Sequence, residues 1–273
     1  MRTGVEHMDS PFVLIRQYKP EDQKACKEII GERIGLFTGP MFVRSLFRET
    51  VYEVIVFIVA IAFIFLGVPI TISVLFVPVV FLGNYFAIRM SNGVKGLEMS
   101  QEFAAMENKY SRDRGGKFFV AELCESNIRL LQDLDKSAVS SLFFLLEGNY
   151  NEATFYPRIQ GSRKRIIGMV GVCSSERDPR RAFMKRLLVR PPYRQTVVEE
   201  RLVNAVLQHC RDFGFLAVDT VCSEVNDELR ESLFACGFEV GASYHKYALG
   251  LISYMGMMQF SAPIKASRSA LEA

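Results

Sequence analysis

The sequence lacks the features that mark several classes of protein. Its six cysteines lie far apart and form no C-x-x-C pair, so spacing gives no support to a metal site. It contains no N-x-S/T acceptor, and most of the cysteines stand in apolar runs, which is typical of small core residues. These absences argue against a disulfide framework and favour a reducing, cytosolic environment.

The sequence also lacks a large excess of one charge and a recognisable targeting signal. The net charge is only +3 and the basic residues are scattered, which argues against a nucleic-acid-binding surface. Residues 1–20 carry acids and bases and no apolar segment of signal-peptide length, so we expect no cleavable signal.

What the sequence does have is one long apolar run, residues 54–86, without a single charge. A membrane-spanning helix needs about 20 consecutive apolar residues, so the run is too long for one crossing and short for two. Gly67, Val68 and Pro69 interrupt it, and proline disfavours a continuous helix. We predict two short apolar helices joined by a tight bend, which insert into the bilayer as a hairpin. The alternative is a helical hairpin buried in a soluble core.

Basic residues flank the apolar run on both sides. Arg33, Arg44 and Arg48 precede it, and Arg89 and Lys95 follow it. Because Lys and Arg are enriched at the cytoplasmic ends of membrane segments, both ends of the run are expected on the cytosolic side. A hairpin allows this arrangement and a single span does not, so both termini are expected in the cytosol and the bilayer is an expected partner.

The rest of the chain has the pattern of an α/β domain with a mixed central sheet and flanking helices. We predict strands at 12–18, 117–122, 166–172, 183–189 and 217–221, closing strands around 239–249, and helices at 21–35, 197–212 and 227–236. Residues 125–164 have weak periodicity and are interpreted as an insertion, helical at 136–146. The expected organisation is a first strand and helix within 1–49, the membrane hairpin at 50–90 and a catalytic-type core at 91–273.

The last hundred residues resemble the GNAT superfamily of acetyl-CoA-dependent N-acetyltransferases. Leu187–Arg194 and the amphipathic helix after it are similar to that family's strand and pyrophosphate-binding turn, and Asn226–Phe238 is similar to its later helix. The resemblance extends to the camello-like, N-acetyltransferase-8-type membrane subfamily and covers nearly the whole chain. It includes Ile15–Asp22, the apolar run, Phe118–Glu122 and Gly168–Val172, and it leaves out the insertion at 125–164.

The resemblance implies a binding site for acetyl-CoA as co-substrate. Backbone N–H groups near Leu188–Val189, freed where two strands splay apart, would stabilise the negative charge on the thioester oxygen. The pyrophosphate would lie at the positive end of the 197–212 helix. The cofactor-binding residues that this match implies are Leu187, Leu188, Val189, Arg194, Gln195, Thr196, Val197, Val198, Glu199 and Asn226.

The turn at 194–199 departs from the family pattern R/Q-x-x-G-x-G/A. Val197 stands where the family has a glycine, which would let a phosphate approach the backbone closely, and Glu199 stands where it has a small residue. Thr196 and Glu199 also have the spacing of a capping box, which would occupy the N–H groups that a phosphate needs. These departures predict weakened or lost CoA binding.

Two residues are candidates for proton transfer. Many relatives protonate the leaving thiolate with a tyrosine four residues before the glycine at 237, but here that position is Leu233, which cannot donate a proton. Tyr244 is a candidate substitute, and packing on a terminal strand is its alternative role. Glu122 is a candidate base for the incoming amine. Its alternative is a structural carboxylate, either in water or paired with Arg165.

The sequence therefore supports two functions. The first is a membrane-anchored N-acetyltransferase that moves acetyl from acetyl-CoA to the amine of a protein lysine or a small cysteine conjugate, on the cytosolic face of the endoplasmic reticulum. The second is a GNAT-fold membrane protein with a degenerate CoA site and weak or no catalysis, which acts by binding or regulation. The turn at 194–199 separates them. No metal and no nucleic acid is expected in either.

Overall fold

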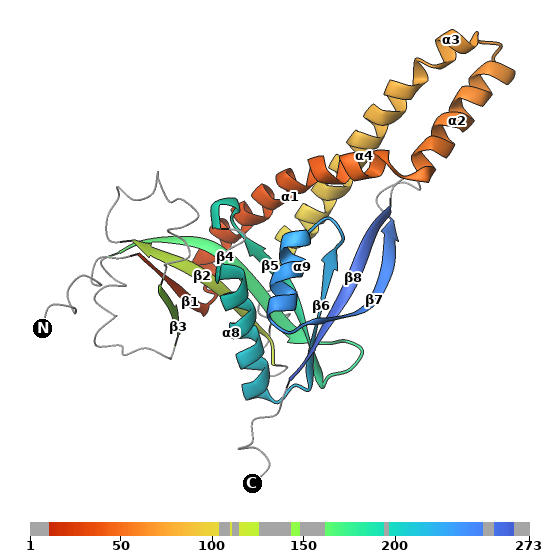
Figure 1. Ribbon diagram of the computed structural model, residues 1–273. Coiled ribbons are helices and arrows are strands. Elements are labelled where there is room, and N and C mark those ends of the chain that lie inside the picture. Colours follow the sequence, from red (N-terminus) through yellow and green to blue (C-terminus); the bar gives the residue numbers. More distant parts are fainter. Residues whose placement is uncertain are drawn as a thin grey trace, which may run out of the picture.

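One eight-stranded sheet organises the part of the chain that the structure describes. The computed structural model describes residues 11–103, 110, 115–125, 143–147, 162–193, 197–247 and 254–264. The sheet has the order β3-β1-β2-β4-β5-β6-β8-β7 (Figure 1). Its strands are β1 (Phe12–Gln17), β2 (Lys117–Glu125), β3 (Phe143–Leu146), β4 (Arg163–Ser174), β5 (Arg181–Val189), β6 (Ala217–Ser223), β7 (Glu239–Tyr247) and β8 (Tyr254–Pro263). The main helices are α1 (Gln23–Leu46), α2 (Glu49–Ile64), α3 (Ile70–Ser73), α4 (Phe76–Glu102), α8 (Val197–Phe213) and α9 (Asp227–Ala235).

The sheet is mixed, as the sequence predicts. β1 runs parallel to β3 and β5 runs parallel to β6, while the other neighbours are antiparallel. β1 precedes the apolar run and pairs with β2, which follows it, with Leu14 opposite Glu122. The two ends of the apolar segment therefore belong to the same sheet, which confirms the expected pairing.

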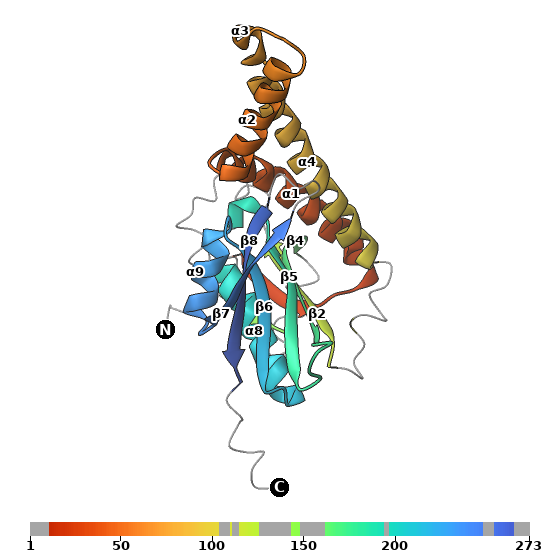
Figure 2. The same cartoon turned by 90° about the vertical axis from the view of Figure 1, so that its right-hand side faces the viewer.

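Helices cover both faces of the sheet, α1 and α4 on one and α8 and α9 on the other (Figure 2). The alternation of side chains along β2 divides the core accordingly. Phe119 and Ala121 pack in the cluster that includes the apolar residues of α8. Phe118 and Val120 pack with Ile29 on the α1 side. Each face of the sheet thus has its own buried apolar layer.

A buried ion triad lies at the start of α1. The guanidinium of Arg16 on β1 donates to Asp22 at 2.7 and 2.8 Å and to Glu122 on β2 at 2.9 and 3.1 Å. All three residues are less than a tenth exposed. Burial alone would lower the pKa of Arg16, but its hydrogen bonds to the two carboxylates raise it well above the ordinary value. The triad joins the first strand, the turn into α1 and a central strand.

The apolar run forms a helical hairpin that projects beyond the sheet (Figure 1). α2 leads outward, a bend at residues 65–69 and the short α3 form the tip, and α4 returns. Gly67 has a φ of +61°, a backbone conformation that favours glycine, so the bend lies where the sequence predicts it. Large apolar side chains remain exposed along the hairpin, including Val56 (67%), Phe57 (66%) and Phe65 (79%). Among the described residues one helix, Ile70–Glu102 counted across the turn before α4, is long and apolar enough to cross a membrane.

Two boundaries differ from the sequence predictions. α1 does not end at 35 but continues through Pro40 to Leu46. Its second half is held against α4 by hydrogen bonds from the amides of Asn84 and Asn92 to the hydroxyls of Ser45 and Thr38. This packing compensates for the backbone bond that proline removes. α4 in turn runs without a break past residue 90, the predicted end of the hairpin segment, to Glu102.

The predicted helix at 136–146 is also wrong over its last four residues. These residues form the edge strand β3, which pairs with β1 so that Phe143 lies opposite Phe12 and Leu146 lies opposite Ile15. Pairing with an open strand edge is a tertiary interaction, and it overrides local helix preference here. The remainder of the predicted helix lies outside the described residues.

Arg16→Met should destabilise the protein by about 3–5 kcal/mol, because it leaves two carboxylates buried without their cation. Chemical denaturation monitored by circular dichroism measures the change in unfolding free energy. Arg180→Met is the matched control, since the Arg180 side chain is 77% exposed and pairs with Asp178 at the surface; it should cost less than about 1 kcal/mol. Equal effects of the two substitutions would contradict a structural role for the triad.

Candidate active site

The site begins where β5 and β6 stop pairing. The two parallel strands are in register from Arg181 opposite Ala217 to Met184 opposite Thr220, and no pair follows in the described sheet. The Thr220 hydroxyl donates to the Met184 carbonyl oxygen at 3.0 Å at the last paired position. Beyond this point β5 pairs with β4 and β6 pairs with β8. We call this diverging part of β5 and β6, residues 185–189 and 221–223, the splay.

An ion pair holds β5 and β6 together in the part where they are still paired, before the splay. Arg181 on β5 donates to both carboxylate oxygens of Asp219 on β6, at 2.5 and 2.8 Å, and to the Ser261 hydroxyl on β8 at 2.9 Å. Burial alone would raise the pKa of Asp219, but the hydrogen bonds from Arg181 and Ser261 bring it below the ordinary value. The strands are therefore held together below the splay.

A bulge in β5 accompanies the divergence. In the ladder with β4, Leu188 lies opposite Met169 and Lys185 opposite Gly171, so β5 has one residue more than β4 between these pairs. Arg186 lies in this interval with a φ of +59°, which is rare for a side chain other than glycine. The inward-facing positions shift by one across the bulge, from Ala182 and Met184 before it to Leu187 and Val189 after it. The bulge thus keeps the core packed while it turns the backbone.

Ion pairs with the helices on the α1 face fix the bulge and the end of β5. Arg186 pairs with Glu102 at the end of α4, at 2.8 Å. Arg190 is 7% exposed, donates from Nε to the Ile166 carbonyl at 3.0 Å, and pairs with Glu28 and Glu32 of α1. Both arginines therefore tie β5 to elements on either side of the apolar hairpin.

The opposite face of the splay is covered by α8 and α9, and the first three residues of α8 belong to the implied cofactor-binding set. Arg194, Gln195 and Thr196 lie outside the described residues, so the predicted capping box is not described. Val198 is buried in the core. Glu199 is 3% exposed and accepts a hydrogen bond from the Ser232 hydroxyl of α9 at 3.1 Å, so this carboxylate lies in the α8–α9 interface.

Asn226, which precedes α9, has an unusual environment. It is 7% exposed, and its Oδ1 is buried without a hydrogen-bond partner in the described part of the chain. A buried acceptor without a donor is costly, and such groups often mark a position that a ligand completes. Asn226 lies in the short turn between β6 and α9, three residues after the end of β6 and therefore near the open end of the splay. It fits an amide-bearing ligand that lies between the two strands.

The two candidates for proton transfer are not brought to the splay. Glu122 lies on β2, which β4 separates from β5, and both its carboxylate oxygens accept from Arg16. This agrees with the alternative of a structural carboxylate, except that its partner is Arg16 and not water or Arg165. Tyr244 is 45% exposed on the edge strand β7, which β8 separates from β6. Leu233, at the family's tyrosine position, is a core residue with 1% exposure.

Other residues of the site could not be found from sequence reasoning. Arg186 carries no sequence signal of its backbone conformation, and its partner Glu102 is 84 residues away in the chain. Arg190 stands inside the recognised motif, but its buried contacts with α1 depend on the three-dimensional arrangement. Among the described residues no group of three or more His, Cys, Asp or Glu side chains could hold a metal ion.

Two substitutions at Arg186 separate the backbone effect of the bulge from its ion pair. Arg186→Ala and Arg186→Gly both lose the pair with Glu102, but only glycine relieves the left-handed conformation. The alanine variant should therefore be about 1 kcal/mol less stable than the glycine variant, as measured by urea denaturation. The same two substitutions at Arg177, in the exposed turn between β4 and β5, supply the control. A glycine variant that is less stable than alanine at position 186 would contradict the bulge conformation.

One protein family matches the part of the chain that holds the splay. The family described as "Acetyltransferase (GNAT) family" matches residues 104–238. Comparison with curated proteins found no match. The N-acetyltransferase from Staphylococcus aureus Mu50 is similar at 12% identity and a TM-score of 0.47, over 93% of this chain and 99% of that chain.

Two further solved structures are similar at low identity. An acetyltransferase of the GNAT family from the same bacterium has 10% identity and a TM-score of 0.44, over 93% of this chain and 99% of that one. The GNAT superfamily phosphinothricin acetyltransferase from Sinorhizobium meliloti, in complex with AcCoA, has 13% identity and a TM-score of 0.40, over 64% and 72% of the two chains. The family match covers β2, β4, the splayed strands β5 and β6, α8 and α9. Residues 104–238 of this chain therefore match the GNAT acetyltransferase family.

Proposed function

We propose that the protein is a membrane-anchored acetyltransferase of the camello-like type, which transfers acetyl from acetyl-CoA to a primary amine at the cytosolic face of the endoplasmic reticulum. The acceptor is the amine of a protein lysine or of a small cysteine conjugate. The observation that carries the proposal is the splay of β5 and β6, with a bulge on β5 and an unpartnered Asn226 oxygen at its open end, in a chain with a GNAT family match.

The backbone around Leu187–Val189 supplies the chemistry. In the reaction the amine nitrogen forms a bond to the thioester carbon, the carbon–sulfur bond breaks, and the amine's proton is released as the thiolate of CoA departs. Negative charge grows on the carbonyl oxygen during attack, and preorganised backbone N–H groups stabilise such charge. β5 has lost β6 as a pairing partner over this segment, which makes its N–H groups on that side candidates for this role.

The start of α8 is the expected position of the pyrophosphate. α8 has 17 residues, and the N-terminus of a helix favours anions because its first N–H groups have no partners within the helix. The Glu199 carboxylate is turned toward Ser232 of α9, which reduces the repulsion expected from a charge at this turn. Asn226 Oδ1 would accept a hydrogen bond from an amide N–H of the CoA arm.

The projecting hairpin is the proposed anchor. α2 has 16 residues and is therefore about 24 Å long. On the return, α4 is already packed against α1 from Asn84 onward, so only its first turns project. The hydrocarbon core of a bilayer is about 30 Å thick. The projecting arms are shorter than this thickness, and the bend at 65–69 is apolar, so we propose that the hairpin enters one side of the bilayer and returns without crossing it.

A degenerate CoA site is the second candidate function. The observation that favours it is Val197, which places a branched side chain at the first residue of α8 where the family has glycine. Under this alternative the chain keeps the fold but acts by binding or regulation.

Calorimetric titration with acetyl-CoA distinguishes the two functions. If the protein is an acetyltransferase, the wild type binds acetyl-CoA with micromolar affinity, which would overturn the weakened binding that the turn at 194–199 predicts, and it releases free CoA thiol when an amine acceptor is added. Asn226→Ala should weaken binding roughly tenfold without loss of stability, because the lost acceptor has no protein partner to leave unpaired. Val197→Gly combined with Glu199→Ala should change the affinity by less than about threefold. Undetectable wild-type binding that this double variant restores would establish the degenerate site instead.

Co-sedimentation with phosphatidylcholine vesicles tests the anchor. Phe65→Glu with Leu66→Glu adds two charges at the exposed tip of the hairpin and should reduce vesicle binding by more than about tenfold, since a buried charge in the bilayer costs about 2.5–3.5 kcal/mol. Leu216→Glu is the matched control, because Leu216 is an exposed apolar residue (58%) at the far end of the sheet domain. Vesicle binding that survives the tip charges would rule out insertion of the hairpin.

A further inference from the structure

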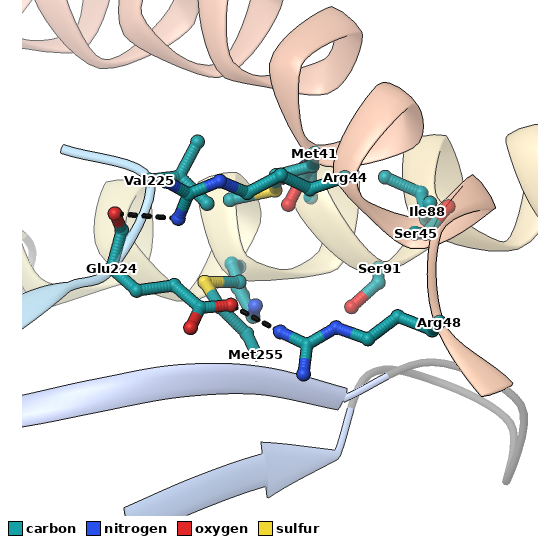
Figure 3. A pocket seen from close by; sticks show the side chains of 11 residues that line it. Met41, Arg44, Ser45, Arg48, Ile88, Ser91, Glu224, Val225 and Met255 are labelled. Carbon is teal, nitrogen blue, oxygen red and sulfur yellow. Dashed lines mark hydrogen bonds and ion pairs between the residues drawn. The ribbon is translucent and has the colours of Figure 1, made fainter. Parts of the chain in front are cut away.

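A charged hollow lies where the hairpin leaves the sheet domain. It is lined by α1, α4, the turn after β6 and the start of β8, it has a cavity volume of about 30 Å³, and it opens to solvent (Figure 3). Two of the elements that line the hollow, α1 and α4, cover the face of the sheet opposite α8 and α9 (Figure 2). The hollow is therefore separate from the expected position of the pyrophosphate at the start of α8.

Three cations and one carboxylate line the hollow. Arg44 donates from Nη1 to the backbone carbonyl of Glu224 at 2.7 Å, and Arg48 pairs with the Glu224 carboxylate. Lys95 of α4 also lines it, is half-buried, and has no ion pair among the described residues. The hollow has three cationic side chains and one carboxylate, so its net charge is positive. The two arginines already bind oxygen atoms of Glu224. The chemistry of the hollow therefore suits an additional oxyanion.

A hydroxyl adds a directional group to this charge. Ser91 is 4% exposed, lines the hollow and points into it (Figure 3). A serine hydroxyl in this position can donate a hydrogen bond to an oxyanion. Ser91 and Lys95 are one turn apart on α4, so they face the hollow from the same side of that helix.

The hollow lies at the base of the hairpin, and this position indicates the source of the anion. Arg48 immediately precedes α2, and Arg44 is one turn earlier on α1. The uncharged run starts at residue 54, so these arginines lie just outside the part of the hairpin that would enter lipid. Phospholipid phosphates occupy the corresponding level of a bilayer, and basic residues at this level bind them.

We propose that this hollow is a phosphate-binding site, filled by the headgroup phosphate of a membrane lipid. The lipid source rests on the insertion of the hairpin proposed above, whereas the phosphate site rests on the hollow alone. Arg44 and Lys95 supply the charge, the Ser91 hydroxyl donates to a phosphate oxygen, and Glu224 competes with the ligand for Arg48. The turn that holds Glu224 follows β6 directly.

Binding of soluble, short-chain phosphatidic acid to the full-length protein in detergent, at physiological salt, tests the site without a charged bilayer surface. We expect saturable one-to-one binding by calorimetry. Arg44→Gln and Lys95→Gln should each weaken it roughly tenfold or more, because each removes a charge-assisted contact. Arg89→Gln removes an equivalent exposed charge from α4 outside the hollow and should have little effect.

Removal of the internal carboxylate should act in the opposite direction. Glu224→Gln removes the carboxylate that pairs with Arg48 and should strengthen binding several-fold, whereas Glu53→Gln, an exposed acid on α2 outside the hollow, should not. Lys95→Gln breaks no protein hydrogen bond described in the structure, so it keeps the test valid if Arg44→Gln fails to fold. No saturable binding by the wild type, or equal weakening by the Arg44 and Arg89 variants, would overturn the phosphate site.

Two further measurements separate the sources of the phosphate. Stronger co-sedimentation with vesicles that contain phosphatidic acid than with phosphatidylcholine alone, lost in Lys95→Gln, supports the lipid. Binding of glycerol 3-phosphate with equal affinity, and no gain on vesicles, overturns the lipid source and leaves a site for a soluble phosphate. Loss of binding to plain phosphatidylcholine vesicles indicates a failed anchor, which is a separate result from a failed phosphate site.

Discussion

The structure depends on the backbone conformation at Arg186. One extra residue with positive φ lets β5 keep its ladder with β4 and its inward-facing side chains while it turns away from β6. If β5 had no bulge, the residues after position 185 would present the wrong faces to the two core layers. The ion pair with Glu102 holds this conformation from outside the sheet, and the Arg181–Asp219 pair fixes the closed end. The site thus lies where β5 stops pairing with β6, and the ion pairs of Arg186 and Arg181 hold the two strands in this arrangement.

The long elements of the fold could be predicted from the sequence, because their periodicity is strong. The amphipathic helix at 197–212 and the strands at 166–172 and 183–189 lie within or nearly coincide with α8, β4 and β5. The bend at Gly67–Pro69 was equally readable. The predictions of element boundaries are wrong where tertiary contacts determine the local structure. Pro40 signals a helix end, but hydrogen bonds with Asn84 and Asn92 carry α1 past it, and β3 depends on an available edge of β1.

The candidate site was predicted less completely for the same reason. The motif at Leu187–Val189 identified the splayed strand, and Asn226 lies at its open end. Glu122 has the sequence context of a strand-end base, yet its partner Arg16 stands 106 residues earlier in the chain and could not be inferred from local pattern. The positive φ of Arg186 is invisible to any sequence pattern. Residues that act through their charge partners therefore escape prediction more often than residues that act through a motif.

The pairing of β1 with β2 also has a consequence for biosynthesis. β1 leaves the ribosome roughly a hundred residues before its partner strand, and the whole apolar hairpin is made in between. β1 cannot pair with β2 until the hairpin between them has folded, because the two ends of the hairpin segment must come together beside α1. A hairpin that enters lipid as it is made brings those ends together early and lowers the entropic cost of closing the loop. Synthesis without a bilayer would leave the same segment exposed while β1 waits, which is a condition that promotes aggregation.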